Sequence, residues 1–194
     1  MDKPLKKDII ADTALACFLS SGYNGTSMDE IVKASGISKG GIYWHFKSKD
    51  EIFLYIIEKR FNEWNNELST RLKSNDSAKE SLSKFVEFFL ELIVAPFLTL
   101  THEFLVQIKD KEMLSRACAC INNSNRSNVI KNVIKAGITK GEFKDLDPET
   151  AANVFISIFE GISLHWFAQQ NDKKILERTA KTALDIFFEG ISNR

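Results

Sequence analysis

Apolar residues recur along this chain at the three- and four-residue spacing of amphipathic helices, and the segments between turns do not alternate in the manner of strands. Only nine glycines and three prolines interrupt the pattern. The pattern predicts about nine helices, at residues 5–21, 27–34, 38–45, 48–72, 82–93, 100–108, 111–140, 148–166 and 176–191. We therefore expect an all-α protein.

The expected helix ends carry residues that suit those positions. Ser27-Met-Asp-Glu30 and Ser48-Lys-Asp-Glu51 have the spacing of capping boxes, in which a serine hydroxyl and a glutamate carboxylate pair with free backbone N–H groups. Gly22 can take the left-handed conformation that ends a helix. Asp147-Pro148 places an N-cap before a proline at the first helical position.

Two of the expected helices are only about two turns long, and the turn Ser35-Gly36-Ile37 joins them. Short helices joined in this way are typical of the helix-turn-helix, whose second helix lies in the major groove of DNA while the first crosses the backbone. The helix at 27–34 would then be the support. The helix at 38–45 would be the reader.

The reading helix contains two adjacent glycines followed by bulky residues. Ile42 and Phe46 are four residues apart, so they share the buried face. Gly40 and Gly41 each cost up to about 1 kcal/mol of helix stability relative to alanine. Close approach of another molecule is the natural reason to find both of them there.

Basic and polar residues surround this helix, although the chain as a whole has no net charge. Lysine and arginine number 26, as do aspartate and glutamate, so any attraction to nucleic acid must be local. Residues 33–49 hold four lysines and no acid. Lys39, Tyr43 and Lys49 are types that bond phosphate oxygens or base edges. The N-termini of the helices that begin near residues 27 and 48 also present free N–H groups to phosphate.

The segment GYNGTSMDEIVKASGISKGGIYWHFKSKDEIFLYII, residues 22–57, resembles the N-terminal DNA-binding region of TetR-family (tetracycline-repressor-like) transcriptional regulators. The likeness covers about residues 5–57 and rests on the order of small, aromatic and lysine positions. Beyond residue 60 it is architectural only. The resemblance implies a helix-turn-helix domain at 1–50 and a ligand-binding and dimerisation domain at 51–194.

The resemblance also implies roles for individual residues. Contacts with DNA would come from Thr26 and Ser27 at the start of the supporting helix, Lys39, Gly40 and Gly41 on the base-reading edge, Tyr43 and His45 on phosphates, Trp44 near a sugar or base methyl, and Lys49 on phosphate. Position 41 is frequently Thr, Ser or Ala in the family. Gly41 removes a possible contact, so the family's base preference does not carry over.

The last two expected helices are apolar over more than one stripe. Helices that are apolar nearly all round must be buried on both sides, which favours a homodimer whose two-fold symmetry matches a palindromic operator. The predicted interface comprises Phe155, Ile158, Ile162, Leu184, Phe187, Phe188 and Ile191.

Fifteen phenylalanines are a high load for 194 residues. The predicted effector site comprises Phe88, Phe89, Phe97, His102, Phe104, Gln107, Phe155, Phe159 and Trp166. An apolar cavity with a few polar groups would suit a small hydrophobic or aromatic molecule. Most of these rings would serve equally well in an ordinary core.

Motifs of catalysis are missing from the sequence. It has no nucleophile elbow, phosphate loop or HExxH pair, so we expect no enzyme, metal site or cofactor. Cys17, Cys118 and Cys120 form no paired framework and suit a reducing cytoplasm. We expect neither a signal peptide nor a membrane span.

Two functions remain open from the sequence. The first is a cytoplasmic repressor released from a palindromic operator by a small molecule. The second is a helical ligand-binding or scaffold protein whose helix-turn-helix is vestigial or contacts protein, which Gly41 and the zero net charge favour. DNA binding that weakens steeply with salt would separate the two.

Overall fold

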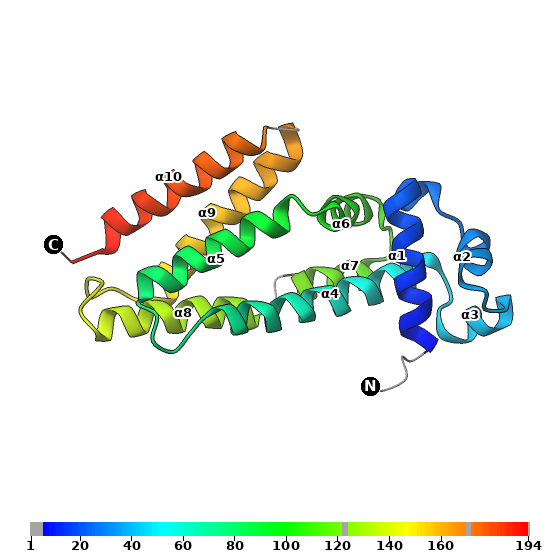
Figure 1. Ribbon diagram of the computed structural model, residues 1–194, viewed down its shortest axis with the longest axis horizontal. Helices are drawn as coiled ribbons and strands as arrows, with labels where there is room; N and C mark the ends of the chain where they lie inside the picture. The colour runs from blue at the N-terminus through cyan, green and yellow to red at the C-terminus, as the bar shows by residue number, and fades with distance from the viewer. Residues whose placement is uncertain (1–5, 122–123, 170–171, 194) are drawn as a thin grey trace. The chain divides into compact units, whose positions relative to one another are not determined.

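The computed structural model describes residues 6–121, 124–169 and 172–193 and places ten α-helices in them (Figure 1). The helices are α1 (Lys6–Gly25), α2 (Met28–Ser35), α3 (Lys39–His45), α4 (Lys49–Arg71), α5 (Ala78–Ile93), α6 (Pro96–Gln107), α7 (Lys111–Ile121), α8 (Ser124–Thr139), α9 (Pro148–Gln169) and α10 (Lys173–Ile191). The all-α expectation is confirmed.

The predicted helix signals at the N-terminal end are confirmed. The Ser27 hydroxyl accepts from the Glu30 N–H, and the Glu30 carboxylate accepts from the Ser27 N–H, which completes the capping box of α2. Gly22 interrupts α1 with a φ of 75°, and Gly36 ends α2 with a φ of 65°. Both angles lie in the left-handed region that glycine tolerates best.

The second capping box differs from the prediction in one half. The Ser48 hydroxyl accepts from the Glu51 N–H as expected. The Glu51 carboxylate instead accepts from the N–H of Lys47, at 2.6 Å. The carboxylate therefore fastens the residue before the cap, and the loop between α3 and α4 is held at both Lys47 and Ser48.

Two predicted boundaries in the middle of the chain were wrong. The sixth helix begins at Pro96 and not at residue 100, because proline is well suited to the first helical position. The segment predicted as one helix over 111–140 contains α7 and α8, and residues 122–123 between them lie outside the described residues. This division accounts for ten helices where nine were expected.

Packing divides the chain into two compact units. The first comprises Met1–Trp64 with Pro96–Asn122, and the second comprises Asn65–Ala95 with Asn123–Arg194. Helix α4 contributes residues to both units. This division by packing differs from the division by function expected at residue 50, which stays a prediction.

One hydrophobic cluster forms the core of the first unit. Ile10, Phe18, Ile31, Ile42 and Phe53 are fully buried in it. These side chains come from α1, α2, α3 and α4, and α6 and α7 complete the cluster. The two short helices are therefore fixed on a packed core and do not depend on their own limited helix stability.

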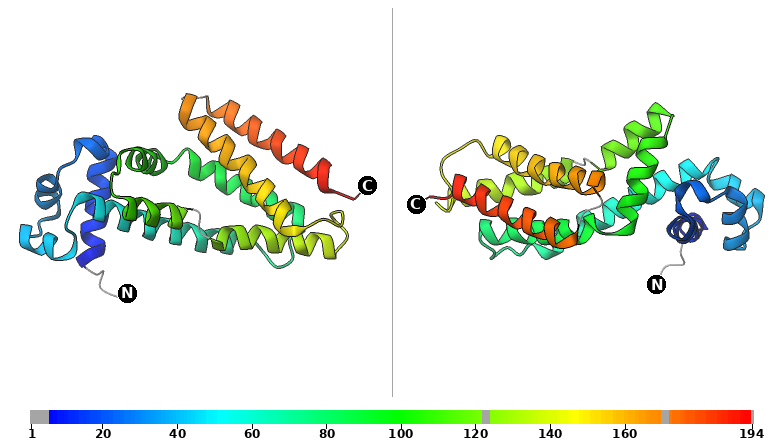
Figure 2. Two further views of the ribbon diagram at one scale, coloured as in Figure 1. Left: turned by 180° about the vertical axis from the view of Figure 1, so that it is seen from behind. Right: turned by 90° about the horizontal axis from the view of Figure 1, so that it is seen from above.

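The second unit is held by aromatic packing and by backbone contacts at its ends. The ring of Phe155 lies 4.9 Å from that of Phe159 and 5.0 Å from that of Phe187, measured between centroids. The Glu142 carboxylate accepts from the N–H of Ala78 at the start of α5. Figure 2 shows α9 and α10 side by side in this unit, and their first turns are capped by Asp147 and Asp172.

Helix α9 is long and apolar enough, by length and composition alone, to cross a membrane. The segment Pro148–Ala168 has a mean hydropathy of 1.2 and contains only Glu149 and Glu160 as charged residues. It is longer than any apolar stretch expected from the sequence. Core helices of soluble proteins pass the same test, but only 22% of the apolar window is buried inside the structure. Much of α9 thus remains uncovered within one copy of the chain.

Candidate functional site

The helix-turn-helix is built as the sequence predicted. Gly36, Ile37 and Ser38 join α2 to α3, and the Ser38 hydroxyl accepts from the Gly41 N–H at the start of α3. Ile42 and Phe46 are buried beneath α3, with exposures of 0% and 2%. Because α3 is anchored on this one face, its opposite face points away from the core.

Gly40 and Trp44 lie four residues apart on that outward face. A Cβ added at Gly40 would meet no atom within 4 Å. The Trp44 side chain is 82% exposed, an unusual state for so large an apolar ring. The outer surface of α3 therefore offers a bare stretch of backbone beside a free indole.

Gly41 differs from its neighbour. A Cβ at this position would lie 3.0 Å from Cγ2 of Ile37 and 3.1 Å from Oγ of Ser38. Such contacts are tighter than nine in ten real Cβ contacts, so a side chain here would press on the turn. The absence of a side chain at Gly41 is explained within the protein, whereas that at Gly40 is not.

Lys39, at the start of α3, is paired with a residue that the sequence analysis did not single out. Its Nζ lies 2.9 Å from Oδ1 of Asp29 in α2. The hydrogen bond and the charge of Asp29 raise the pKa of Lys39, and the nearby Tyr43 has a smaller effect in the same direction. Lysine ten residues from an acid carries no sequence signal for a pair, because only the turn brings them together.

Thr26 and Ser27 use their hydroxyls within the protein. Thr26 is 2% exposed, and its Oγ1 donates to the carbonyl of Gly22 at 2.9 Å. Ser27 completes the capping box with Glu30. The Thr26 hydroxyl is therefore used inside the protein, where it stabilises the turn before α2. A DNA contact at Thr26 stays a prediction, and it would have to come from the backbone of this residue.

Lys49 is also engaged within the protein. Its Nζ donates to the carbonyl of Tyr23 at 3.0 Å and to that of Thr26 at 3.2 Å. It lies 4.6 Å from the centre of the Tyr23 ring. These contacts occupy two of the three N–H donors of the ammonium, so only one is left for a phosphate.

The remaining predicted DNA contacts flank the bare face. Tyr43 and His45 are half-buried on α3. Lys33 and Lys47 are exposed at either side of the helix-turn-helix. One short helix, α3, thus carries Lys39, Gly40, Tyr43, Trp44 and His45, while its Ile42 face packs on the core.

The predicted effector residues divide between the two units. In the first unit Phe104 is fully buried against Tyr23 and Phe53, and Phe97 packs on Phe53 and Trp64, while His102 and Gln107 are exposed. In the second unit Phe89, Phe155 and Phe159 pack together, and Phe88 lies beneath the guanidinium of Arg71. These rings form a separate aromatic core in each unit.

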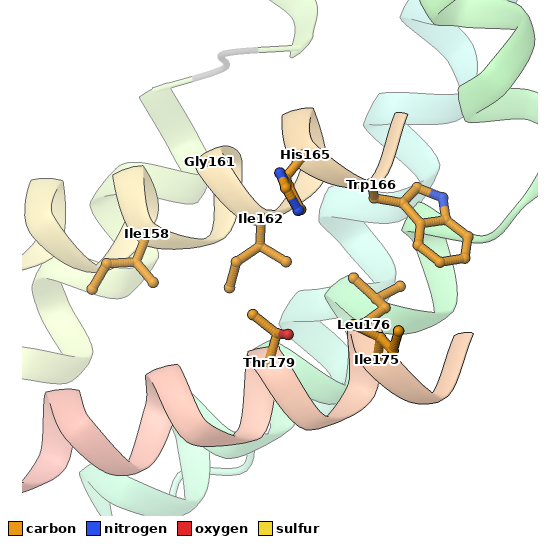
Figure 3. A pocket seen from close by; sticks show the side chains of 8 residues that line it. All are labelled: Ile158, Gly161, Ile162, His165, Trp166, Ile175, Leu176 and Thr179. Carbon is orange, nitrogen blue, oxygen red and sulfur yellow. The ribbon is translucent and has the colours of Figure 1, made fainter. Parts of the chain in front are cut away.

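Trp166 alone among the predicted effector residues lines a described groove, which lies between α9 and α10 (Figure 3). The groove has a volume of about 250 Å³. Ile158 and Ile162 of α9 point toward α10, and Thr179 of α10 points back toward α9. A second groove of about 460 Å³ lies on the same pair of helices and is lined by residues that include Val154, Ile186 and Gly190.

Four predicted interface residues are already buried within one copy of the chain. Phe155, Leu184, Phe187 and Ile191 are at most 9% exposed, so a partner could cover little more of them. The predicted interface did not include four residues of these helices that are well exposed. They are Val154, Leu164, Ile175 and Ile186, at 49%, 66%, 47% and 63%. The helical period could have placed these residues on the face opposite the core.

Comparisons with known proteins agree with this geometry. Residues 10–56 match the family of bacterial regulatory proteins described as the tetR family, and residues 60–193 match the C-terminal region of QacR-like proteins. The chain is 26% identical to the transcriptional regulator QacR of Staphylococcus aureus over 196 residues, which covers 96% of this chain and 98% of the relative.

Two further similarities extend over nearly the whole chain. A fatty acid metabolism regulator protein of Bacillus subtilis is 23% identical over 190 residues, 95% of each chain. The crystal structure of the transcriptional regulator FadR from Bacillus subtilis in complex with stearoyl-CoA shares the fold, with a TM-score of 0.74 and 21% identity. It covers 95% of this chain and 98% of that one.

Proposed function

This chain belongs to the TetR family of bacterial transcriptional regulators, and we propose that it is a dimeric repressor released from a palindromic operator by a small hydrophobic molecule. The observation that carries the proposal is the outward face of α3. There Gly40 leaves the backbone bare, Trp44 is 82% exposed, and Ile42 fixes the helix from beneath. A helix about 10 Å wide with such a face suits a major groove about 12 Å wide.

The charges around α3 support binding to DNA in particular. Lys33, Lys39 and Lys47 are exposed around the helix, although the chain as a whole is neutral. Phosphate contacts fix the position of a protein on the duplex, and base contacts specify the sequence. In this proposal Tyr43 and His45 bind phosphates, and Lys39 with Trp44 reaches base edges. Because its partner is DNA, the protein would act in the bacterial cytoplasm.

The dimer is proposed from the exposed apolar surface of α9 and α10. Val154 and Leu164 of α9, with Ile175 and Ile186 of α10, are all at least 47% exposed. Two grooves lie on the same helices. A second copy that packs these helices against its own would cover the patch and supply two-fold symmetry. The two α3 helices would then meet half-sites about 34–36 Å apart, or at the spacing that a DNA bend provides.

The effector class is proposed from the composition of the two aromatic cores and from the relatives. Phe89 and Phe159 are packed together in the second unit, and Phe97 and Trp64 in the first. One relative is a fatty acid metabolism regulator, and one structural neighbour was crystallised with stearoyl-CoA. A hydrophobic or aromatic molecule would suit an apolar site lined by rings of this kind. Binding would stabilise a state in which the two α3 helices no longer match the operator.

The test begins with selection of duplexes from a random pool by the purified chain. We expect a palindromic consensus and binding that falls steeply as salt rises, because each neutralised phosphate contributes about 0.9 to the slope of log K against log salt. A response to salt that is flat, or failure to select any duplex at low salt, would show that the chain is a ligand-binding or scaffold protein.

A further inference from the structure

Lys49 stands at the first position of α4, where the family resemblance would give it a phosphate of DNA. Its surroundings are different. Nζ donates to the carbonyls of Tyr23 and Thr26 at 3.0 and 3.2 Å and lies 4.6 Å from the centre of the Tyr23 ring. An ammonium group has three N–H donors, so two are used by carbonyls and the aromatic face lies near the charge.

The same two segments are joined by a second contact. The Tyr23 hydroxyl donates to Oδ1 of Asp50, the residue after Lys49. Tyr23 is 4% exposed, and burial, followed by the hydrogen bond with Asp50, raises the pKa of its hydroxyl. The hydroxyl therefore keeps its proton and remains a donor at neutral pH.

The Tyr23 ring has little freedom to move. It packs on Phe18 of α1, Phe53 of α4 and Phe104 of α6, with centroid distances of 5.4, 5.1 and 5.3 Å. A fixed ring means that both the hydroxyl and the carbonyl of Tyr23 are fixed. Through these two groups Tyr23 holds Asp50 and Lys49 in the first turn of α4.

We propose that Lys49 is a positioning residue for DNA binding and not a phosphate ligand. With Tyr23 and Asp50 it fixes the start of α2 against the start of α4. Thr26, whose carbonyl Lys49 binds, comes directly before Ser27, the N-cap of α2. The N–H groups that the capping side chains leave unpaired at the two helix starts can bind phosphate, so the separation of the two starts must match that of two phosphates on the duplex. This inference rests on the proposed function wherever it is tested by DNA binding.

The discriminating measurement is the salt dependence of operator binding by Lys49→Met and Lys49→Arg, with a duplex selected by the wild-type chain. A positioning role predicts that both variants lose affinity, by about tenfold or more, because hydrogen bonds to a charged group are lost or distorted. It also predicts an unchanged salt slope in both. The larger, planar guanidinium of arginine does not fit the site that the carbonyls of Tyr23 and Thr26 and the Tyr23 ring form around the Lys49 ammonium.

A phosphate ligand predicts the opposite pattern. Lys49→Met would then lower the slope by about 0.9 for each phosphate lost, and Lys49→Arg would retain both affinity and slope. That result overturns the proposal. Full affinity in Lys49→Met overturns it as well.

Tyr23→Phe supplies a second variant that keeps the ring and removes only the hydroxyl. Its matched control is Tyr55→Phe, since Tyr55 also donates to an aspartate, Asp8, in the same unit. We expect lower operator affinity and an unchanged salt slope in Tyr23→Phe, and wild-type affinity in Tyr55→Phe. Equal losses in the two variants would mean a general effect on stability and would count against the proposal.

A failure of the proposed function can be told apart from a failure of this inference. If the wild-type chain selects no duplex, the melting temperature of the free protein still tests the cluster formed by Lys49, Tyr23 and Asp50. Lys49→Met and Tyr23→Phe should then lower the melting temperature by less in combination than the sum of their separate effects, because each disturbs the same cluster. Additive shifts would overturn the inference whatever the outcome with DNA.

Discussion

The Nζ atom of Lys39 lies 2.9 Å from Oδ1 of Asp29, so the lysine expected to read DNA is paired with a carboxylate of the supporting helix. Both side chains are well exposed, at 63% and 76%. An exposed pair of this kind contributes little to stability. Its effect should fall on recognition instead, because Asp29 both restrains Lys39 and places a negative charge beside the reading helix.

Asp29→Asn should raise affinity for DNA several-fold at low salt. The substitution removes an anion that repels phosphate and releases Lys39 from its partner. Lys39→Ala should lower affinity and also change the preference among operator variants. Binding isotherms on a set of single-base operator variants measure both effects. The control is Glu63→Gln in α4, which changes the net charge equally; if it raises affinity as much, the effect is one of overall charge.

Gly40→Ala and Gly41→Ala should separate a glycine required by DNA from one required by the fold. A methyl group at Gly40 meets nothing in the protein, so Gly40→Ala should stabilise α3 by up to about 1 kcal/mol and yet weaken operator binding. A methyl group at Gly41 presses on Ile37 and Ser38, so Gly41→Ala should gain no stability. Thermal unfolding and DNA titration of both variants provide the test. A Gly40→Ala protein with full affinity would contradict the proposed approach of DNA to this residue.

The helix-turn-helix could be predicted from the sequence because local chemistry determines it. Ser27, Gly36 and Ser38 mark helix ends by rules that depend on a few neighbouring residues, and the structure shows all three in those roles. Ile42 and Phe46 were assigned to the core by their spacing alone, and both are buried. Helix ends and buried faces of short amphipathic helices follow from short-range pattern.

Partners of polar side chains could not be predicted in the same way. Lys49 and Tyr23 are 26 residues apart, and only the packing of α1 against α4 brings the ammonium to the carbonyl. A lysine in a basic window looks the same in the sequence whether it faces solvent or a helix end. The burial of some predicted interface residues escaped the sequence for a related reason: Phe155 looks like part of a surface stripe, but in the fold it packs on Phe85, Phe159 and Phe187.

A charge placed on the exposed apolar surface of α9 and α10 should prevent the proposed dimer. Ile186 is 63% exposed and lines a groove on these helices, so Ile186→Asp should fold normally but leave a carboxylate inside the contact. Sedimentation velocity should show a dimer for the wild type and a monomer for the variant. Operator affinity should fall with the loss of the second α3 helix.

Val106→Asp is the matched control for that experiment. Val106 of α6 is 73% exposed, so it offers an apolar side chain of similar exposure outside α9 and α10. We expect this variant to remain a dimer. Monomers in both variants, or dimers in both, would argue against an interface formed by α9 and α10.

Phe104→Ala should lower the free energy of unfolding by about 3–5 kcal/mol, the usual cost of removing a buried ring. Phe104 is fully buried and packs on Tyr23 and Phe53, so the substitution would open a cavity in the core of the first unit. Urea denaturation measures this change. Trp166→Ala, at a partly exposed position, should cost less. A loss of less than about 1 kcal/mol in Phe104→Ala would place that ring in a deformable site instead of a rigid core.

Stability at high pH should depend on Tyr23. Burial and the hydrogen bond with Asp50 raise the pKa of Tyr23 above its ordinary value of 10.0. The unfolded chain therefore loses this proton at a lower pH than the folded chain does. The stabilisation is fully present below about pH 10 and is lost as pH rises through the folded pKa. Urea denaturation at neutral pH and above pH 10 should show a loss of stability with pH that is smaller in Tyr23→Phe. Tyr55→Phe provides the comparison, because the pKa of Tyr55 is also raised. If Tyr23→Phe lost stability with pH as the wild type does, the Tyr23 hydroxyl would not be held as the structure shows.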